Sequence, residues 1–302
     1  MSHTQHDLGR LGIWTFAFDP HPAARVRDAA AELEELGYGA VWFGEAFGRD
    51  AVSQAALLLG ATERIAVATG IANIYLRDPV ATAAAERSLG EQHPGRFVLG
   101  LGGHRVPGSP TAIAGYRIPF SGKPVSSMRD YLDNLDAVPL NAAAAPVPPR
   151  RLLAALGPKM LDLAAERTWG AHTYFVPVAH TAMARGRMGP EAYLAVEQAV
   201  VLDPDRERAR RTQREHVGGY LQAPHQRNNL LRLGFGEADL ADGGSDRLVD
   251  AVVVGGDIES TAERVREHFR AGADHVCLQV LTATPGELPM SQWRELAALV
   301  QR

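Results

Sequence analysis

Residues 151–176 read RLLAALGPKMLDLAAERTWGAHTYFV, and this stretch indicates the fold. An apolar run at 151–156 predicts a strand, and Gly157-Pro158 then opens a helical pattern that lasts to about Trp169. A second apolar run follows at 171–176. Two strands joined by a helix with such short links pair in parallel, so the stretch predicts one strand–helix–strand unit of a parallel sheet.

The same alternation continues on both sides of this unit. Further strands are predicted at 11–16, 40–44, 65–72, 96–103, 192–202 and 274–281, each followed by a helical pattern. Eight such units in one domain over residues 1–302 predict an α/β fold of the (β/α)₈ TIM-barrel type with insertions. The competing fold is a doubly wound open sheet, which favours a glycine-rich fingerprint after the first strand. That position reads FAFDPHP (16–22), so the barrel is favoured.

Two stretches depart from the simple alternation. Residues 104–149 lack a steady period and contain VPGSP, IPFSGKP and NAAAAPVPP, although 126–137 has a helical pattern. We interpret the rest of this stretch as a long insertion after the fourth strand, and long loops in compact domains are usually functional or mobile. Residues 219–256 are predicted to be mostly helical.

The composition excludes several classes of protein. The net charge of −4 gives no sign of a nucleic-acid or membrane surface, and no apolar run has the length of a membrane span. The single cysteine, Cys277, permits no internal disulfide, and the N-terminus has no apolar signal-peptide core. The 11 histidines show no metal-binding spacing such as HExxH, so no metal site is expected. We therefore expect a soluble cytoplasmic protein.

The chemistry of a TIM barrel sits at the carboxyl ends of its strands. Glu45 follows the second strand, where it would accept a proton or orient a ligand, or would be an ordinary loop acid. Gly70 and Asn73 follow the third strand, as a place for close ligand approach or as a plain bulge. His104 follows Gly103 after the fourth strand and is a candidate for proton transfer near neutral pH, or a structural histidine.

Gly157, Pro158 and Lys159 mark the turn after the fifth strand. The free N–H groups of a helix start attract anions, glycine lets a ligand approach, and the lysine adds a positive charge. These three residues therefore predict a phosphate site, with an ordinary helix start as the alternative. Thr173 and Val176, at the end of the sixth strand, are expected to contribute to the same site.

Several segments together resemble a known family. AVWFGEAFGRDA (40–51), ATGIANIYLRDP (68–79), HPGRFVLGLGG (93–103), ALGPKMLDLAAERTWGAHTY (155–174) and GADHVCLQVL (272–281) are similar to the luciferase-like flavin and deazaflavin oxidoreductases. The similarity is to the actinobacterial branch that uses coenzyme F420, and it spans residues 9–300.

The resemblance implies a barrel that holds its cofactor ring in the mouth. It implies a non-proline cis peptide near Gly70–Ile71, a cofactor phosphate at the 157–159 turn, and a ring that lies beside Gly70, Ile71, Ala72, Asn73 and Gly103. His104 would shuttle a proton, and Glu45 would orient the ring or polarise the substrate. The insertion at 104–149 would serve as a lid and select the substrate.

The resulting functional prediction is hydride transfer between coenzyme F420 and a small organic substrate, in a protein whose relatives often form homodimers. The alternatives are an FMN-dependent monooxygenase and a non-enzymatic flavin or deazaflavin carrier of the same fold. A fourth is an unrelated phosphate-binding barrel such as an aldolase or isomerase. That class needs a Schiff-base lysine or paired carboxylates on strand ends, and the strand ends show only Lys159, at a helix start.

Overall fold

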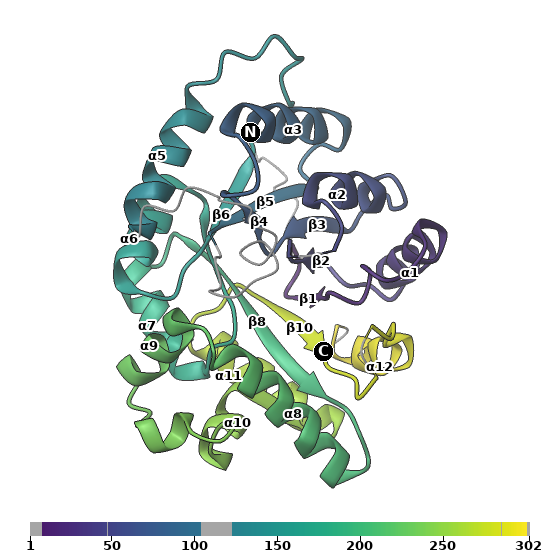
Figure 1. The fold of residues 1–302 in the computed structure, drawn as a ribbon. Helices are drawn as coiled ribbons and strands as arrows, with labels where there is room; N and C mark the ends of the chain where they lie inside the picture. Colours follow the sequence, from purple (N-terminus) through teal and green to yellow (C-terminus); the bar gives the residue numbers. More distant parts are fainter. Residues whose placement is uncertain (1–7, 47, 104–122, 285, 301–302) are drawn as a thin grey trace, which may run out of the picture.

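A closed ring of eight parallel strands forms the centre of the molecule (Figure 1). The computed structural model describes residues 8–46, 48–103, 123–284 and 286–300. The strands follow each other around the ring in sequence order, and the last one pairs with both the first and the seventh, which closes the barrel. The eight strands are β1 Leu11–Trp14, β2 Ala40–Phe43, β3 Ala66–Thr69, β5 Phe97–Gly102, β6 Arg150–Ala154, β7 Gly170–Thr173, β8 Tyr193–Val201 and β10 His275–Val280.

Helices surround this ring on the outside (Figure 1). Each strand is followed by at least one helix, which gives the eight units that the sequence predicts. Because helices cover the outer face and side chains fill the inside, almost every strand residue is buried. The surrounding helices are α1 Ala23–Glu35, α2 Ala51–Leu59, α3 Pro79–Gln92, α5 Pro124–Asp136, α6 Pro158–Arg167, α7 Val178–Met188, α11 Ile258–Arg270 and α12 Met290–Leu296. The predicted TIM barrel is thus confirmed, and the open sheet is excluded.

The segment after β8 adds three helices to the basic plan. They are α8 Arg206–Tyr220, α9 Pro224–Arg232 and α10 Asp246–Val252, and Figure 1 shows them together in green beside β8. The mostly helical prediction for 219–256 is confirmed, except that Val253–Gly255 forms a short strand, β9, which pairs with the end of β8.

The stretch predicted as a lid divides differently in the structure. Helix α5 confirms the helical pattern at 126–137, but it packs between α3 and α6 as the regular helix of the fourth unit. It is therefore part of the barrel wall, held by its buried face of Met128, Tyr131, Leu132 and Leu135. Residues 104–122, the first part of the predicted lid, lie outside the described residues.

Candidate active site

A cavity of about 890 Å³ opens at the carboxyl ends of the strands. Its lining comes from the ends of six strands, the start of α5 and α6, and helix α9. The larger side chains in its lining are Trp14, Phe16, Ile71, Ile74, Tyr75, Met128, Met160, His172, Tyr174, Tyr220, His225 and Arg232, together with Glu45 and the 157–159 turn. A pocket of this size, mostly apolar and with a few convergent polar groups, suits a ring-shaped organic ligand.

One wall of the cavity is the backbone after β3. The peptide bond between Gly70 and Ile71 is cis, where the resemblance places it, and both residues line the cavity. The chain then resumes a short strand, β4 Ala72–Asn73, against β5. Two contacts hold the cis peptide: Trp14 Nε1 donates to the Gly70 carbonyl at 3.1 Å, and the Glu45 N–H donates to the Ile71 carbonyl at 3.0 Å.

The Glu45 side chain forms hydrogen bonds and an ion pair within this same wall. Its carboxylate accepts the Asn73 N–H at 2.8 Å and the Ala51 N–H at 3.2 Å, and it forms an ion pair with Arg77. Arg77 also reaches Asp50 at 2.9 Å. The carboxylate therefore holds the wall through these bonds, while a direct catalytic role for Glu45, which also lines the cavity, stays a prediction.

Helix α6 begins at the opposite side of the cavity. Gly157 is its N-cap residue, Pro158 follows as the first helical residue, and no side chain caps the free N–H groups. Lys159 is exposed, and a Cβ placed on Gly157 would lie 3.9 Å from Nη2 of Arg232. Gly157, Pro158 and Lys159 all line the cavity, so the predicted anion corner does face the pocket.

The cations at this corner differ in whether a carboxylate pairs with them. Within the described ranges Lys159 forms no ion pair, and Arg232 contacts only the neutral Asn229 side-chain oxygen at 3.1 Å. Arg187 also lines the cavity, but it is paired with Asp162 at 2.5 Å. Lys159 and Arg232 therefore leave positive charge for an anionic ligand over the start of α6.

The strand β7 contributes different residues from those predicted. Thr173 and Val176 are buried, at 0% and 1% exposure, and neither lines the cavity. Side chains alternate along a strand, so their neighbours His172 and Tyr174 face the cavity instead. Thr173 therefore points away from the cavity by strand parity, and Val176, beyond the end of β7, does not line it either, so the structure does not bring the two residues to the predicted phosphate site.

The remaining predicted residues have mixed outcomes. Gly103 lines the cavity, and a Cβ there would lie 2.6 Å from the Tyr75 ring, so a larger residue would have to displace that ring. Ala72 and Asn73 are buried behind the wall and do not line the cavity. His104 lies outside the described residues.

Sequence reasoning missed the residues that α8 and α9 bring to the mouth, namely Tyr220, His225, Gln226 and Arg232. Tyr220 shares a 2.7 Å hydrogen bond with Tyr174, which donates to Oε1 of Gln279 at 2.8 Å. Tyr174 has one proton, so Tyr220 donates in the shared bond, and the Tyr220 oxygen keeps its capacity to accept. Burial raises the pKa of both hydroxyls, which keeps them protonated. The sequence predicted that this segment is mostly helical, but it gave no sign that the helices pack over the cavity.

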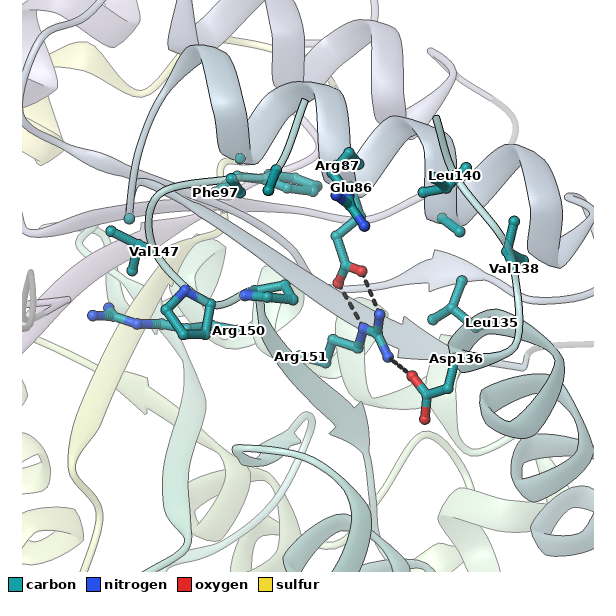
Figure 2. A pocket seen from close by; sticks show the side chains of 17 residues that line it. Glu86, Arg87, Phe97, Leu135, Asp136, Val138, Leu140, Val147, Arg150 and Arg151 are labelled. Atoms are coloured by element: carbon teal, nitrogen blue, oxygen red, sulfur yellow. Dashed lines mark hydrogen bonds and ion pairs between the residues drawn. The ribbon is translucent and has the colours of Figure 1, made fainter. Parts of the chain in front are cut away.

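A second cavity, of about 300 Å³, lies at the amino ends of β5 and β6 (Figure 2). Figure 2 shows Arg151 between Glu86 and Asp136, and it forms ion pairs with both. These carboxylates are thereby occupied, and the cavity lies at the end of the barrel that carries stability rather than chemistry.

Two further features were searched for in the described part of the chain. It contains no group of three or more histidine, cysteine, aspartate or glutamate side chains placed to hold a metal ion. None of its helices combines the length and apolar character that a membrane crossing requires.

Comparisons with known proteins agree with this architecture. The family model for the luciferase-like monooxygenases matches residues 6–275. A Mycobacterium tuberculosis protein provisionally named a coenzyme F420-dependent oxidoreductase is 25% identical, over 96% of this chain and 99% of its own length.

Two solved structures share the fold at low identity. One is an F420-dependent secondary alcohol dehydrogenase with a bound F420–acetone adduct, with a TM-score of 0.73, 15% identity, and coverage of 97% of this chain and 99% of that one. The other is the oxygenating component of 3,6-diketocamphane monooxygenase from Pseudomonas putida with FMN, with a TM-score of 0.69, 16% identity and 97% coverage of both chains. The barrel, the cis peptide at the strand end and the family match lead to one conclusion: the chain belongs to the luciferase-like monooxygenase family.

Proposed function

We propose that this protein is an oxidoreductase that binds coenzyme F420 and uses it to transfer a hydride to or from a small organic substrate. The observation that carries the proposal is the single cavity that joins an aromatic and backbone wall at Gly70–Ile71 to a cationic helix start at 157–159. Such a cavity fits a flat redox ring with an anionic tail. The family membership and the F420-named relative support it.

The described residues fit the cofactor in two places. The uncapped N–H groups of α6, with Lys159 and Arg232, would hold the phosphate of the tail. The Gly70–Ile71 backbone, Trp14 and Tyr174 would contact the ring. The bound deazaflavin would supply the hydride chemistry, while the protein fixes its position and excludes water.

Contacts between aromatic rings hold the aromatic wall of the cavity in place. The Trp14 ring meets the Phe16 ring edge-on at 4.6 Å between centroids, and meets Tyr174 at 4.9 Å. Ile74, Met128 and Met160 add apolar side chains to the lining. We infer from this lining that the substrate is a hydrophobic small molecule.

FMN is the second candidate cofactor, and the resulting activity would be a monooxygenase. It is favoured by the structural neighbour that holds FMN in the same fold, and its phosphate would use the same cationic corner. The aldolase-type alternative loses support because the chain has only two lysines, Lys123 and Lys159, and neither lies on a strand.

Titration of the purified protein with F420 and with FMN, followed by fluorescence quenching, tests the proposal. F420 is expected to bind more tightly than FMN. Lys159→Ala should weaken binding by roughly ten- to a hundredfold, since a charge-assisted contact contributes about 1.5–3 kcal/mol. Lys159→Arg should retain most of the affinity.

Arg25→Ala is the matched control, because Arg25 is an exposed cation on α1 and does not line the cavity. Binding of FMN alone would replace the F420 assignment with the monooxygenase. Wild-type affinity of Lys159→Ala at low salt would refute the phosphate site.

A further inference from the structure

His180 lies directly behind the start of α6, where the 157–159 turn meets the large cavity. It belongs to the first turn of α7, which packs beside α6 (Figure 1), and its side chain is fully buried. Nε2 of His180 lies 2.9 Å from the carbonyl oxygen of Leu156. Leu156 is the residue just before Gly157, the N-cap of α6. The imidazole therefore holds the peptide group that leads into the helix.

The chemistry of the two partners fixes the direction of this bond. A carbonyl oxygen only accepts, so the proton is on Nε2 and the imidazole of His180 donates. Burial lowers the pKa of His180 to about 4; the bond to Leu156 opposes this shift, and the positive charge of Arg232 adds to it. The ring is therefore neutral at pH 7, and its single proton lies on Nε2.

The peptide between Leu156 and Gly157 transmits this constraint to the cavity. Among the described residues only the bond between Gly70 and Ile71 is cis, so the 156–157 peptide is trans and planar. In a trans peptide the N–H points in the direction opposite to the carbonyl. The carbonyl faces the buried His180, which does not line the cavity, whereas Gly157 does. The Gly157 N–H therefore points away from His180, on the cavity side.

This N–H is one of two free backbone donors at the start of α6. Pro158 has no N–H, and the N–H groups of Met160 and Leu161 each lie 3.1 Å from the Gly157 carbonyl. Within the part of the chain that the structure describes, no group accepts from the N–H of Gly157 or of Lys159. An anion at this turn therefore has these two backbone donors, together with the side-chain cations.

We infer that His180 is a positioning residue for the cofactor phosphate, an inference that rests on the proposed function. Its hydrogen bond to the Leu156 carbonyl sets the plane of the 156–157 peptide and thereby aims the Gly157 N–H at the anion. The same bond polarises the peptide and makes this N–H a better donor, because linked hydrogen bonds strengthen one another. His180 itself touches no ligand.

The test compares ligands that differ in the phosphate. Dissociation constants are measured by fluorescence quenching for FMN and riboflavin, and for F420 and its deazariboflavin core without the phosphate-bearing tail. The ratio within each pair measures how much the tail adds to affinity. His180→Leu removes the donor and keeps a side chain of similar size, so it should lower this ratio roughly three- to tenfold. His180→Gln keeps an N–H that can reach the position of Nε2 and should restore most of the ratio.

His275→Leu is the matched control for the loss of a buried imidazole. His275 is equally buried, its Nδ1 lies 2.8 Å from the Gly9 carbonyl, and it begins β10, at the end of the barrel opposite the cavity. This variant should lose stability and still show the wild-type ratio. The comparison therefore separates an effect on the phosphate from a general effect on folding.

Nuclear magnetic resonance gives a direct readout of the predicted donor. In wild-type protein labelled with ¹⁵N-glycine, the amide resonance of Gly157 should shift more on saturation with FMN than with riboflavin. Equal shifts with the two ligands reject the contact between this N–H and the phosphate.

The outcomes distinguish this inference from the proposed function. A His180→Leu variant that keeps the wild-type ratio, or that loses affinity equally for both ligands of a pair, overturns the positioning role and leaves the proposed function standing. A wild-type protein that binds neither ring rejects the proposed function first. Wild-type binding of a ring with a ratio near one rejects the phosphate site at 157–159, and the inference with it.

Discussion

Replacement of Glu45 by alanine should destabilise the wall of the cavity and the whole fold. The side chain is 6% exposed, and it accepts from two backbone N–H groups and one guanidinium. Those donors belong to three different segments: the start of α2, the short strand β4, and the turn before α3. The Glu45 N–H bond to Ile71 remains in the variant, so only the side-chain contribution is removed.

The size of the effect follows from these partners. Arg77 has a side chain that is 11% exposed, and Glu45→Ala leaves it with the single exposed partner Asp50. Breaking a buried ion pair by removal of one member costs about 3–5 kcal/mol. The two unpaired N–H groups, at about 1–3 kcal/mol each, act on the same network and do not add in full. We expect a loss of about 3–5 kcal/mol for Glu45→Ala and a smaller loss for Glu45→Gln.

Urea unfolding followed by tryptophan fluorescence measures this loss. The matched control is Glu32→Ala, which removes an ion pair with Arg294 whose side chains are 30% and 57% exposed. That control should cost less than about 1 kcal/mol. If Glu45→Ala is no less stable than Glu32→Ala, the carboxylate does not support the wall, and a direct catalytic role regains its place.

Other predictions concern ion pairing and pH. Arg151→Met leaves the nearly buried Glu86 carboxylate without its ion-pair partner and should lower the free energy of unfolding in urea by about 3–5 kcal/mol. Asp136 is the other partner of Arg151 and is 51% exposed, so Asp136→Ala should cost under about 1 kcal/mol. Equal effects of the two variants would show that burial does not govern this network. Burial lowers the pKa of four histidines to about 3 or 4 in the folded protein; these are His172, His180, His216 and His268. Stability should peak near pH 7, where the protons bound by the four histidines of the unfolded chain balance the one that folded Glu197 retains. Below that pH the same histidines bind protons in the unfolded chain but not in the folded protein, so the free energy of unfolding falls as pH falls. Above it, burial raises the pKa of Glu197 to about 8, so the folded state keeps a proton that the unfolded state releases above about pH 4.5, and stability declines up to about pH 8. Glu197→Gln should remove that decline, by up to about 1.4 kcal/mol per pH unit, and a wild-type decline that persists in the variant would reject the assignment.

The sequence predicted the fold well because the barrel repeats one local pattern. An apolar run followed by a helical pattern recurs eight times, and each unit is readable without its neighbours. The anion corner was equally local. Gly157, Pro158 and Lys159 are consecutive, so their joint position needed no tertiary information.

Failures occurred where one residue of strand register or a distant contact decided the outcome. At the end of β7, the prediction chose Thr173, although His172 and Tyr174 have the inward parity. The sequence does not show that the Glu45 carboxylate pairs with Arg77, because the two residues are 32 positions apart and meet only in the folded protein.

The sequence by itself determined the eight strand–helix units, the helix start that offers positive charge to an anion, and the membership in a redox family. Only the tertiary structure decided which side chains share the cavity. Barrel closure turns each strand end toward a common mouth, and the docking of α9 brings Arg232 to within reach of Gly157, 75 positions away in the chain. The physical reason is that periodicity is set by the local backbone, whereas the partners of His172, Glu45 and Lys159 depend on long-range packing and register, which no short stretch of sequence records.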